Sequence, residues 1–321
     1  MTQSSLLDVE IRPGRPPLLP ASAIRGMPWE EFRGALRSAV VEYGSVMVRG
    51  FGLTGPDDVA GVFRGLADRL MTEREAFAAR DVVADGVYTS SAWPANQQMC
   101  MHHELSYALD APGLMMFACL AAPASGGTTG VADSAAVLDA LPPGVVERFE
   151  RDGWLLVRSY NDEIGATVAE SFGTDDPAAV EAYCRANAIE FAWQPGGGLR
   201  TRQRRPAVLR HPVTGRRCWF NQIAFLNEAT MAPEVREYLL EVYGPDGLPF
   251  TTRFGDGEPL HPELVELITD TYERHTLREP WQAGDLLLVD NVRTAHGRDP
   301  FDGDRSVLVA MADPIRPGGP A

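Results

Sequence analysis

The sequence contains no lysine, so all 29 of its basic residues are arginines. The chain also has 44 aspartates and glutamates, which gives a formal net charge of -15. This acidic balance argues against nucleic acid or an anionic membrane surface as a broad partner, because both attract basic faces. No apolar run reaches about 18 residues, and the first residues lack the basic and apolar pattern of a secretory signal. We therefore expect a cytoplasmic protein with neither nucleic-acid nor membrane partners.

Cysteine and histidine are also scarce. The four cysteines are never spaced as CxxC, so we expect neither a disulfide framework nor a thiolate zinc site. No GxGxxG follows a strand pattern and no Walker A motif is present, which argues against a dinucleotide- or nucleotide-binding fold. Of the six histidines, His102 and His103 are adjacent and precede Glu104. This cluster is the first candidate site.

The hydrophobic pattern predicts many short strands among helices. Apolar residues recur at helical spacing in five segments and form short apolar runs in five others. The expected helices are 28–43, 57–70, 178–188, 233–243 and 262–276, and the main expected strands are 45–49, 114–120, 154–160, 285–290 and 306–311. Asp57 is the predicted N-cap of its helix, and the stretch 71–101 is expected to be largely irregular. The pattern favours an α+β protein with an antiparallel β core.

His102 and Glu104 have the spacing of two ligands on one strand. Residues two apart on a strand point to the same side, so both can reach one metal ion while His103 faces away. If His103 were the ligand in place of His102, the strand that carries them would have to pair in a different register. A third ligand is His296, in the segment DNVRTAHGR that follows a strong apolar strand. Two histidines and one carboxylate leave coordination positions open, which is typical of non-haem Fe(II) oxygenases.

Arg305 begins the next strand after His296. An arginine at the mouth of a β core can bind a carboxylate through two parallel hydrogen bonds. Arg298 is the alternative, although its place in the turn favours contact with substrate or support of the loop. Because His102 and His296 lie far apart in the chain, a shared metal requires one domain. We predict a single domain over 26–313, an N-terminal arm at 1–25 and a flexible tail at 314–321.

Two segments resemble a known family. WQAGDLLLVDNVRTAHGRDPFDGDRSVLVAM (281–311) and MHHELSY (101–107) resemble the C-terminal signature and the HxD/E segment of the TauD/TfdA superfamily of Fe(II)/2-oxoglutarate-dependent dioxygenases. Segments 89–104, 124–134 and 220–225 are similar to its clavaminate synthase-like and syringomycin-hydroxylase-like branch. The resemblance covers roughly residues 30–312. It implies a distorted double-stranded β-helix (jelly-roll) core flanked by helices.

The resemblance also implies roles for matched residues. It implies that His102, Glu104 and His296 bind Fe(II). It implies that Arg305 and Thr129, rather than the neighbouring Thr128, bind the distal carboxylate of the cosubstrate 2-oxoglutarate, with O2 as the other reactant. Related halogenases have a small residue where this chain has Glu104. Hydroxylation, desaturation or cyclisation is therefore expected instead of halogenation.

Members of that branch commonly act on amino acids or their derivatives, either free or tethered to a carrier protein. The resemblance thus implies an amino-acid-like substrate in specialised metabolism, such as antibiotic biosynthesis. An arginine run at 200, 202, 204 and 205 is either a solvated loop or a site for an anionic group or an acidic carrier protein. The candidate substrate contacts are Ser90, Asn96, Asn221 with its neighbour Gln222, and Arg298.

Two other classes of function compete with this interpretation. A zinc hydrolase could use the same two histidines and carboxylate, but it would not explain Arg305 together with Thr129. A binding protein that keeps the fold without turnover is disfavoured by the intact set of ligands. The sequence does not predict an oligomeric state.

Overall fold

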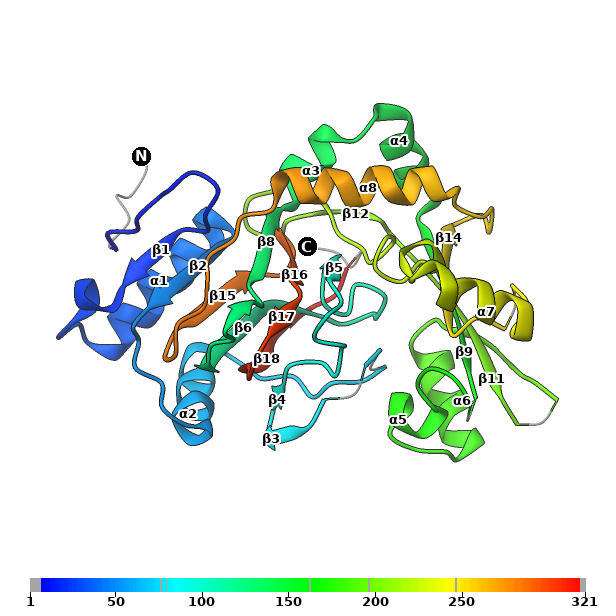
Figure 1. Cartoon of the computed structure of the whole chain (residues 1–321), viewed down its shortest axis with the longest axis horizontal. Coiled ribbons are helices and arrows are strands. Elements are labelled where there is room, and N and C mark those ends of the chain that lie inside the picture. The colour runs from blue at the N-terminus through cyan, green and yellow to red at the C-terminus, as the bar shows by residue number, and fades with distance from the viewer. Residues whose placement is uncertain are drawn as a thin grey trace.

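The computed structural model describes residues 7–317 except 76, 79, 162, 196 and 246. Helices and sheets are mixed throughout, as the sequence predicts. Figure 1 shows one region of sheets with helices on its left and upper sides, and a second group of strands and helices on the right. In the described residues no helix is both long and apolar enough to cross a bilayer.

The largest sheet has seven strands in the order β1-β2-β15-β6-β18-β4-β3. Its neighbours are antiparallel except for β1 and β2, which run parallel. The strands are β1 (Leu18–Pro20), β2 (Ser45–Arg49), β3 (Val82–Ala84), β4 (Val87–Thr89), β6 (Ala111–Ala121), β15 (Leu286–Asp290) and β18 (Ser306–Ile315). β1 lies inside the segment predicted as an N-terminal arm, and β18 extends past residue 314, where the tail was expected to begin. The domain boundaries themselves stay predictions.

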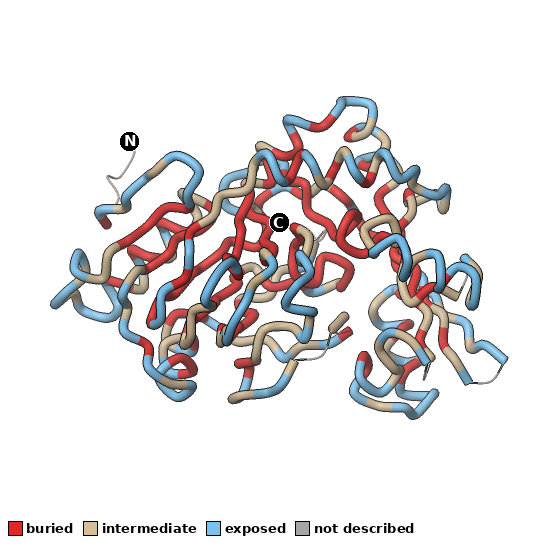
Figure 2. Tube along the Cα trace, in the orientation of Figure 1, coloured by how far each residue is buried: buried red, intermediate tan, exposed pale blue. Residues whose placement is uncertain are grey.

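Alternate side chains of this sheet point to opposite faces, and each face packs against a different hydrophobic core. On β6, Met115 and Phe117 belong to the inner core, whereas Leu114 and Met116 belong to the core under the helices. Both faces are apolar because both are covered, and this explains the unbroken LMMFACL run. Two helices cover the outer face: α1 (Trp29–Tyr43) and α2 (Pro56–Leu66). Figure 2 shows the buried segments concentrated in the strands.

The ends of these two helices test the predicted caps. α1 ends at Gly44, whose φ of 85° is a conformation that side chains disfavour. The N-cap of α2 is Gly55 with Pro56 in the first turn, so the prediction of Asp57 as the cap was wrong. Pro is well suited to the first helical position because its missing N–H would be unpaired there. Asp57 instead lies in the first turn, near the positive end of the helix dipole.

A three-stranded sheet in the order β5-β16-β8 faces the inner core. It consists of β5 (Met99–His102), β8 (Thr129–Asp133) and β16 (Thr294–Arg298). Segment 71–101 therefore contains β3, β4 and the start of β5 and is less irregular than expected. His296 lies within a strand and not after one. Helices α3 (Ser134–Ala140) and α8 (Pro262–His275) contact this sheet.

The strands and helices on the right of Figure 1 form a second group around a four-stranded sheet, β10-β11-β9-β14. Its strands are β9 (Trp154–Tyr160), β10 (Glu190–Trp193), β11 (Leu199–Arg205) and β14 (Phe250–Phe254). The remaining elements are α4 (Pro143–Asp152), α5 (Val168–Phe172), α6 (Pro177–Ala186), α7 (Pro233–Tyr243), β7 (Ser125–Gly126), β12 (Val208–Arg210), β13 (Arg217–Trp219), β17 (Phe301–Asp302) and the 3-10 turns η1 (Ala21–Ile24) and η2 (Glu228–Thr230).

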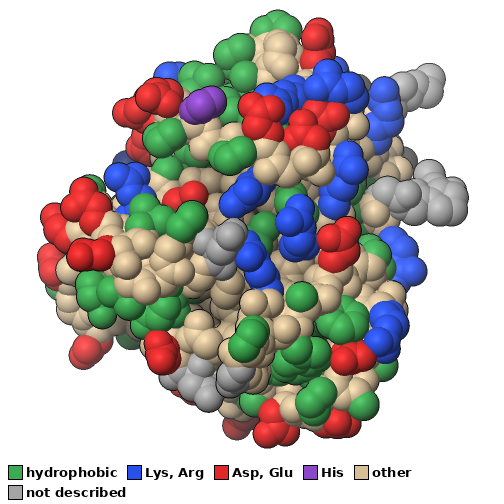
Figure 3. All heavy atoms as spheres, turned by 90° about the vertical axis from the view of Figure 1, so that its right-hand side faces the viewer, with side chains coloured by type: hydrophobic (Ala, Val, Ile, Leu, Met, Phe, Trp, Pro, Cys, Tyr) green, Lys and Arg blue, Asp and Glu red, His purple; other side chains and the backbone are tan. Residues whose placement is uncertain are grey.

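The arginine run lies on β11, where strand alternation separates its members. Arg202 and Arg204 are exposed, whereas Arg205 is 5% exposed and donates to the backbone oxygens of Tyr107 and Asn187. Figure 3 faces this side of the molecule and shows arginines gathered among acidic side chains. The run is thus partly a buried structural contact and partly a surface feature.

Candidate metal centre

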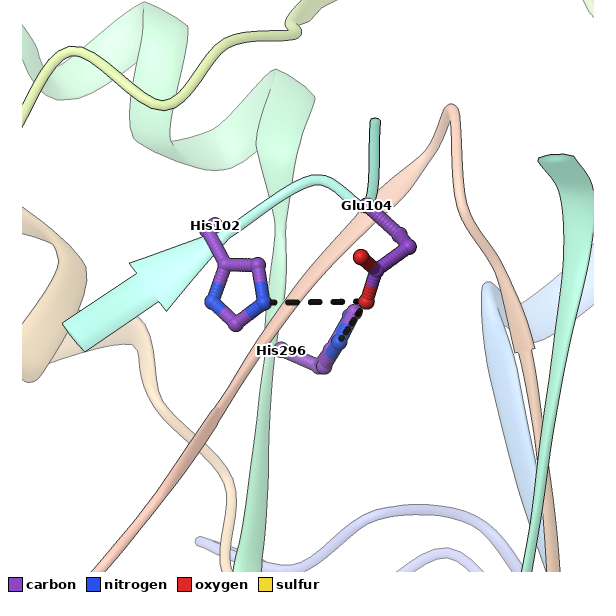
Figure 4. A group of neighbouring side chains, drawn as sticks. All are labelled: His102, Glu104 and His296. Carbon is purple, nitrogen blue, oxygen red and sulfur yellow. Dashed lines mark ion pairs between the residues drawn. The ribbon is translucent and has the colours of Figure 1, made fainter. Parts of the chain in front are cut away.

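The pairing of β5 with β16 places His102 directly opposite His296. Glu104 follows β5, and Figure 4 shows its carboxylate turned toward both imidazoles. Glu104 Oε2 lies 4.0 Å from His102 Nε2 and 3.7 Å from His296 Nε2. One atom from each of the three residues lies within 4.8 Å of the others, and all three residues are buried. Two nitrogens and one carboxylate oxygen could therefore hold one divalent ion.

Backbone contacts fix the orientation of these groups. His102 Nδ1 lies 2.8 Å from the carbonyl oxygen of Cys100. A carbonyl can only accept, so Nδ1 carries the proton and Nε2 keeps its lone pair toward Glu104. The Asn291 side chain forms two hydrogen bonds with the Glu104 backbone. Its Oδ1 accepts from the Glu104 N–H at 2.9 Å, and its Nδ2 donates to the Glu104 carbonyl at 3.0 Å. The segment that carries His296 thus also positions Glu104.

The electrostatics of the cluster suit metal binding. Burial, with a smaller effect of His296, lowers the pKa of His102 to about 3, so its imidazole is neutral at pH 7. Burial alone would raise the pKa of Glu104, but Arg80 and the two histidines outweigh it and hold that pKa well below its usual range. Metal ligands must be deprotonated, so neither group has to lose a proton at neutral pH.

His103 lies away from this cluster. It is fully buried, and its ring nitrogens contact the Asn291 carbonyl and, at 2.8 Å, the Ser134 hydroxyl. Both of its nitrogens are thus engaged elsewhere. The structure places His102, and not His103, beside Glu104 and His296.

Arg305 and Thr129 lie together next to the histidines. Arg305 Nη2 is 3.4 Å from Thr129 Oγ1, and Arg305 Nε donates to the Gly127 carbonyl at 3.0 Å. Thr128 instead donates to the carboxylate of Asp299. Burial and the nearby Arg298 lower the pKa of Arg305 to about 10. Among the described residues no carboxylate forms an ion pair with Arg305. The charge of its guanidinium is therefore available to pair with an anionic ligand.

One cavity contains His102, His296, Thr129 and Arg305, together with Phe117 and Val309 of the main sheet. Ser90 and Arg298 also line it. Arg298 donates to the backbone oxygens of Trp93, Pro94 and Gln97, so it supports the loop before β5.

Two of the predicted substrate contacts lie elsewhere. Asn96 is exposed on its turn. Asn221 is 1% exposed, and its amide bonds to the backbone of Ala207 and Ile223. The neighbouring Gln222 lines a second, smaller pocket together with Glu104 and His102, and its Oε1 is buried without a hydrogen-bond partner. Gln222 is therefore the better candidate of the pair.

The structure places a charged pair, Arg80 and Glu73, beside the metal ligands, and this pair could not be predicted from the sequence. Arg80 Nη2 donates to Glu104 Oε2 at 3.0 Å, and Arg80 Nη1 lies 3.5 Å from Glu73 Oε1. Both side chains are nearly buried, at 8% and 11% exposure. Burial, opposed by Arg80, raises the pKa of Glu73 to about 7. Neither residue belongs to a motif or a regular spacing, so pattern analysis could not find them.

Aromatic side chains form the wall next to these charges. Phe77 contacts the rings of Trp93, Phe225 and Phe250 with centroids 4.9 to 5.8 Å apart. Phe225 stacks on His102 at 4.5 Å. A cleft of about 750 Å³ is lined by Phe77, Trp93 and Phe250, and by Arg80 and Glu73. Arg80 thus lies where this cleft meets the cavity of the metal ligands. Aromatic walls with a few charged groups are typical of small-molecule sites.

Comparison with known proteins places the chain in a family. Residues 15–311 match the model of the taurine catabolism dioxygenase TauD, TfdA family. A dapdiamide synthesis protein of Enterobacter agglomerans is 34% identical over 86% of this chain and 84% of its own length. A clavaminate synthase-like protein of Arabidopsis thaliana is 28% identical over 86% of this chain and 83% of its own. The chain belongs to the TauD/TfdA family.

Solved structures agree at the level of the fold. A taurine dioxygenase from Burkholderia xenovorans has a TM-score of 0.56 at 17% identity and covers 98% of this chain and 91% of its own. The protein AAD-2, solved with Mn(II) and N-oxalylglycine, has a TM-score of 0.53 at 16% identity, and the match covers 97% of this chain and 98% of AAD-2.

The family match confirms the predicted enzyme class: the protein is a dioxygenase that uses Fe(II), 2-oxoglutarate and O2.

Proposed function

We propose that this enzyme hydroxylates an unactivated C–H bond of an amino acid or amino-acid derivative. The observation that carries the proposal is that Arg305 and Thr129 line one cavity with His102 and His296, the two histidines that cluster with Glu104. The three ligands would hold Fe(II), and the arginine and threonine would hold the distal carboxylate of 2-oxoglutarate. The seven- and three-stranded sheets that carry these residues would form the distorted double-stranded β-helix.

The residues present fit both groups. The donor set is two imidazoles and a carboxylate, which suits Fe(II) and leaves positions open for a chelating keto acid. Arg305 is a half-buried cation without a carboxylate partner in the described part of the chain, and a dicarboxylate cosubstrate would supply one. When bound, the iron and 2-oxoglutarate supply the oxidation: O2 is reduced, 2-oxoglutarate leaves as succinate and CO2, and one oxygen atom goes to the substrate.

The chain itself supplies position and a dry environment. Asn291 and the Cys100 carbonyl hold Glu104 and His102 in place. Phe117, Val307 and Val309 line the inner wall and exclude water from the reacting centre. Arg298 keeps the loop of residues 93–97 over the cavity. Glu104 occupies the carboxylate position, so the site has no vacancy for a halide ligand.

The substrate class rests on two kinds of support. The relative that is 34% identical is named for dapdiamide synthesis, which fits a biosynthetic role in specialised metabolism. The outer end of the cavity carries a cation, a carboxylate and aromatic side chains, which suit a small polar substrate with an organic side chain. Exposed Arg202 and Arg204 leave room for an acidic carrier protein as an alternative form of delivery.

The test is aerobic turnover with Fe(II), 2-oxoglutarate and each of a panel of L-amino acids. We expect one or a few of them to stimulate succinate formation and to gain the mass of one oxygen atom. Loss of two hydrogen atoms instead would indicate desaturation or cyclisation. Product formation without consumption of O2 and 2-oxoglutarate would overturn the oxygenase assignment in favour of a hydrolase, and a product seen only with a carrier thioester would establish a tethered substrate.

A further inference from the structure

The charged pair formed by Arg80 and Glu73 lies next to the proposed iron ligands but is not itself among the residues proposed to hold iron or 2-oxoglutarate. Arg80 lies on the Glu104 side of the cavity, and the proposed cosubstrate residues Arg305 and Thr129 lie together on another wall. A buried arginine and a nearly buried glutamate require a reason, because taking charged side chains out of water is costly unless they are paired. Their surroundings indicate what completes the pairing.

The hydrogen bonds of Arg80 are incomplete. Its Nε donates to Ser91 Oγ at 2.9 Å and its Nη2 to Glu104 Oε2 at 3.0 Å. Nη1 is buried and has no hydrogen-bond partner, since Glu73 Oε1 lies 3.5 Å away. A guanidinium has five N–H donors, so several are available to a ligand at the boundary between the cleft and the metal cavity.

Metal binding would weaken the contact between Arg80 and Glu104 and make more of the Arg80 donors available. Glu104 Oε2, the oxygen that Arg80 contacts, is also the oxygen nearest to both histidines. A divalent ion held by Glu104 would repel the guanidinium and compete with it for the charge of that carboxylate. The loaded site would therefore leave Arg80 in need of another anion, with Glu73 still beside it.

Glu73 and Arg80 are held in place by the residue between them. Glu75 is 2% exposed, its backbone oxygen accepts from Tyr107 Oη and Arg158, and its carboxylate accepts from Tyr183 and Gln203. These contacts tie the loop to the second group of strands and helices. The two charges are thus presented from an anchored loop, and their geometry is set before a ligand arrives.

A positive and a negative group 3.5 Å apart match the head group of an amino acid, whose carboxylate and ammonium are also neighbours. We propose that Arg80 binds the carboxylate and Glu73 the ammonium of a free α-amino acid substrate, so that the pair determines substrate specificity. This inference rests on the proposed function. It favours a free amino acid over a carrier thioester, because a thioester has no carboxylate for Arg80 to bind.

The test measures binding and not turnover. The anaerobic protein with Fe(II) and 2-oxoglutarate is titrated with each of the twenty L-amino acids, and the visible iron–keto-acid absorption band reports binding through its shift. The best amino acid is then compared with its C-terminal amide and its N-acetyl derivative. We expect each derivative to bind about ten- to a hundredfold more weakly than the free amino acid.

Variants assign the two contacts. Arg80→Gln should weaken the free acid about ten- to a hundredfold but leave the amide nearly unchanged, and Arg80→Lys should restore part of the difference. Glu73→Gln should remove the preference for the free amine over the N-acetyl derivative. Arg64→Gln replaces an exposed arginine of α2 that lines neither the cleft nor the metal cavity; it is the control and should change neither preference.

The outcomes separate this inference from the proposed function. Absence of the absorption band altogether contradicts the proposed iron and 2-oxoglutarate site. A band that forms but responds equally to acid and amide, or to no free amino acid, overturns the role of Arg80 and Glu73 while the proposed site stands. Equal weakening of all ligands in Arg80→Gln, with no rescue by lysine, means that Arg80 is only structural.

Discussion

The inner and outer ends of the active-site cavity are built in different ways. The inner end consists of groups on or next to paired strands: His102 on β5, His296 on β16 and Thr129 on β8. The outer end consists of Arg80 and Glu73 on a loop, with aromatic side chains from several segments. Strand register fixes the first set to one another, whereas tertiary contacts alone fix the second.

The pKa values of the carboxylates at the two ends are also shifted in opposite directions. At the inner end Arg80 and the histidines keep the pKa of Glu104 low, so it stays ionised and ready for a metal. At the outer end burial raises the pKa of Glu73 to about 7 despite Arg80. The inner end is thus prepared to hold a metal, and the outer end is where we propose that the substrate is recognised. The following predictions test this difference, beginning with the largest effect.

Replacing one inner histidine should abolish metal binding, whereas replacing its neighbour should not. We expect His102→Ala to lose Mn(II) binding in isothermal titration calorimetry, because one of only three protein ligands is gone. His103→Asn is the matched control: it should retain binding but lose about 1–3 kcal/mol of stability through its contacts with Ser134 and Asn291. Loss of Mn(II) binding in the control alone would show that the register assigns the wrong histidine.

The two arginines of the inner cavity should differ in their effect on cosubstrate affinity. We expect Arg305→Gln to weaken 2-oxoglutarate binding to the Mn(II)-loaded protein about a hundredfold, because it removes the cation that lies beside Thr129 and is placed for the distal carboxylate. Arg298→Gln should change this affinity little but expose the loop of residues 93–97 to limited proteolysis, since its donors hold that loop. The reverse pattern would exchange the two assignments.

Asn291 should matter to the inner end through Glu104. Asn291→Ala removes both hydrogen bonds to the Glu104 backbone, and we expect Mn(II) affinity to fall about ten- to a hundredfold. The measured quantity is the dissociation constant, with circular dichroism to confirm folding. Asn227→Ala, which removes another buried asparagine with backbone contacts, serves as the control and should leave the metal affinity unchanged. An unchanged constant in a folded Asn291→Ala variant contradicts the positioning role.

The outer carboxylate should give a smaller, pH-dependent effect on the stability of the metal-free protein. The folded pKa of Glu73, about 7, lies above the ordinary value of 4.5, so its contribution is fully present below 4.5 and is lost as the pH rises toward 7. The glutamine of Glu73→Gln cannot ionise. As the pH rises from 5 to 8, the free energy of unfolding in urea should therefore increase by about 1–3 kcal/mol in this variant relative to the wild type. Glu30→Gln, at an exposed position of α1, should show no such gain.

Most of the regular structure could be predicted from the sequence because its signals are local. The apolar pattern at 45–49, 154–160 and 233–243 gave the bounds of β2, β9 and α7 correctly. Errors arose where tertiary pairing decides the outcome: β3, β4 and the start of β5 lie in a stretch with weak periodicity, and β18 continues past its apolar core to Ile315 because β6 pairs with it.

The same distinction explains which site residues could be found. His102, Glu104 and His296 are recognisable because a strand imposes a spacing of two and the C-terminal motif is contiguous. Arg80 and Glu73 have no fixed offset from any motif, and only the folded loop brings them to Glu104. Asn221 and Gln222 were both candidates because the sequence cannot tell which of two neighbouring amides faces the site, and the structure favours Gln222.

The central claim is that His102, Glu104, His296 and Arg305 form one site for Fe(II) and 2-oxoglutarate. Anaerobic visible spectroscopy tests it most directly in the wild type, His296→Ala and Arg305→Gln. We predict an iron–keto-acid absorption band in the wild type, no band in His296→Ala, and a band in Arg305→Gln only at much higher 2-oxoglutarate. No band in the wild type, or the same band in all three proteins, would contradict the account.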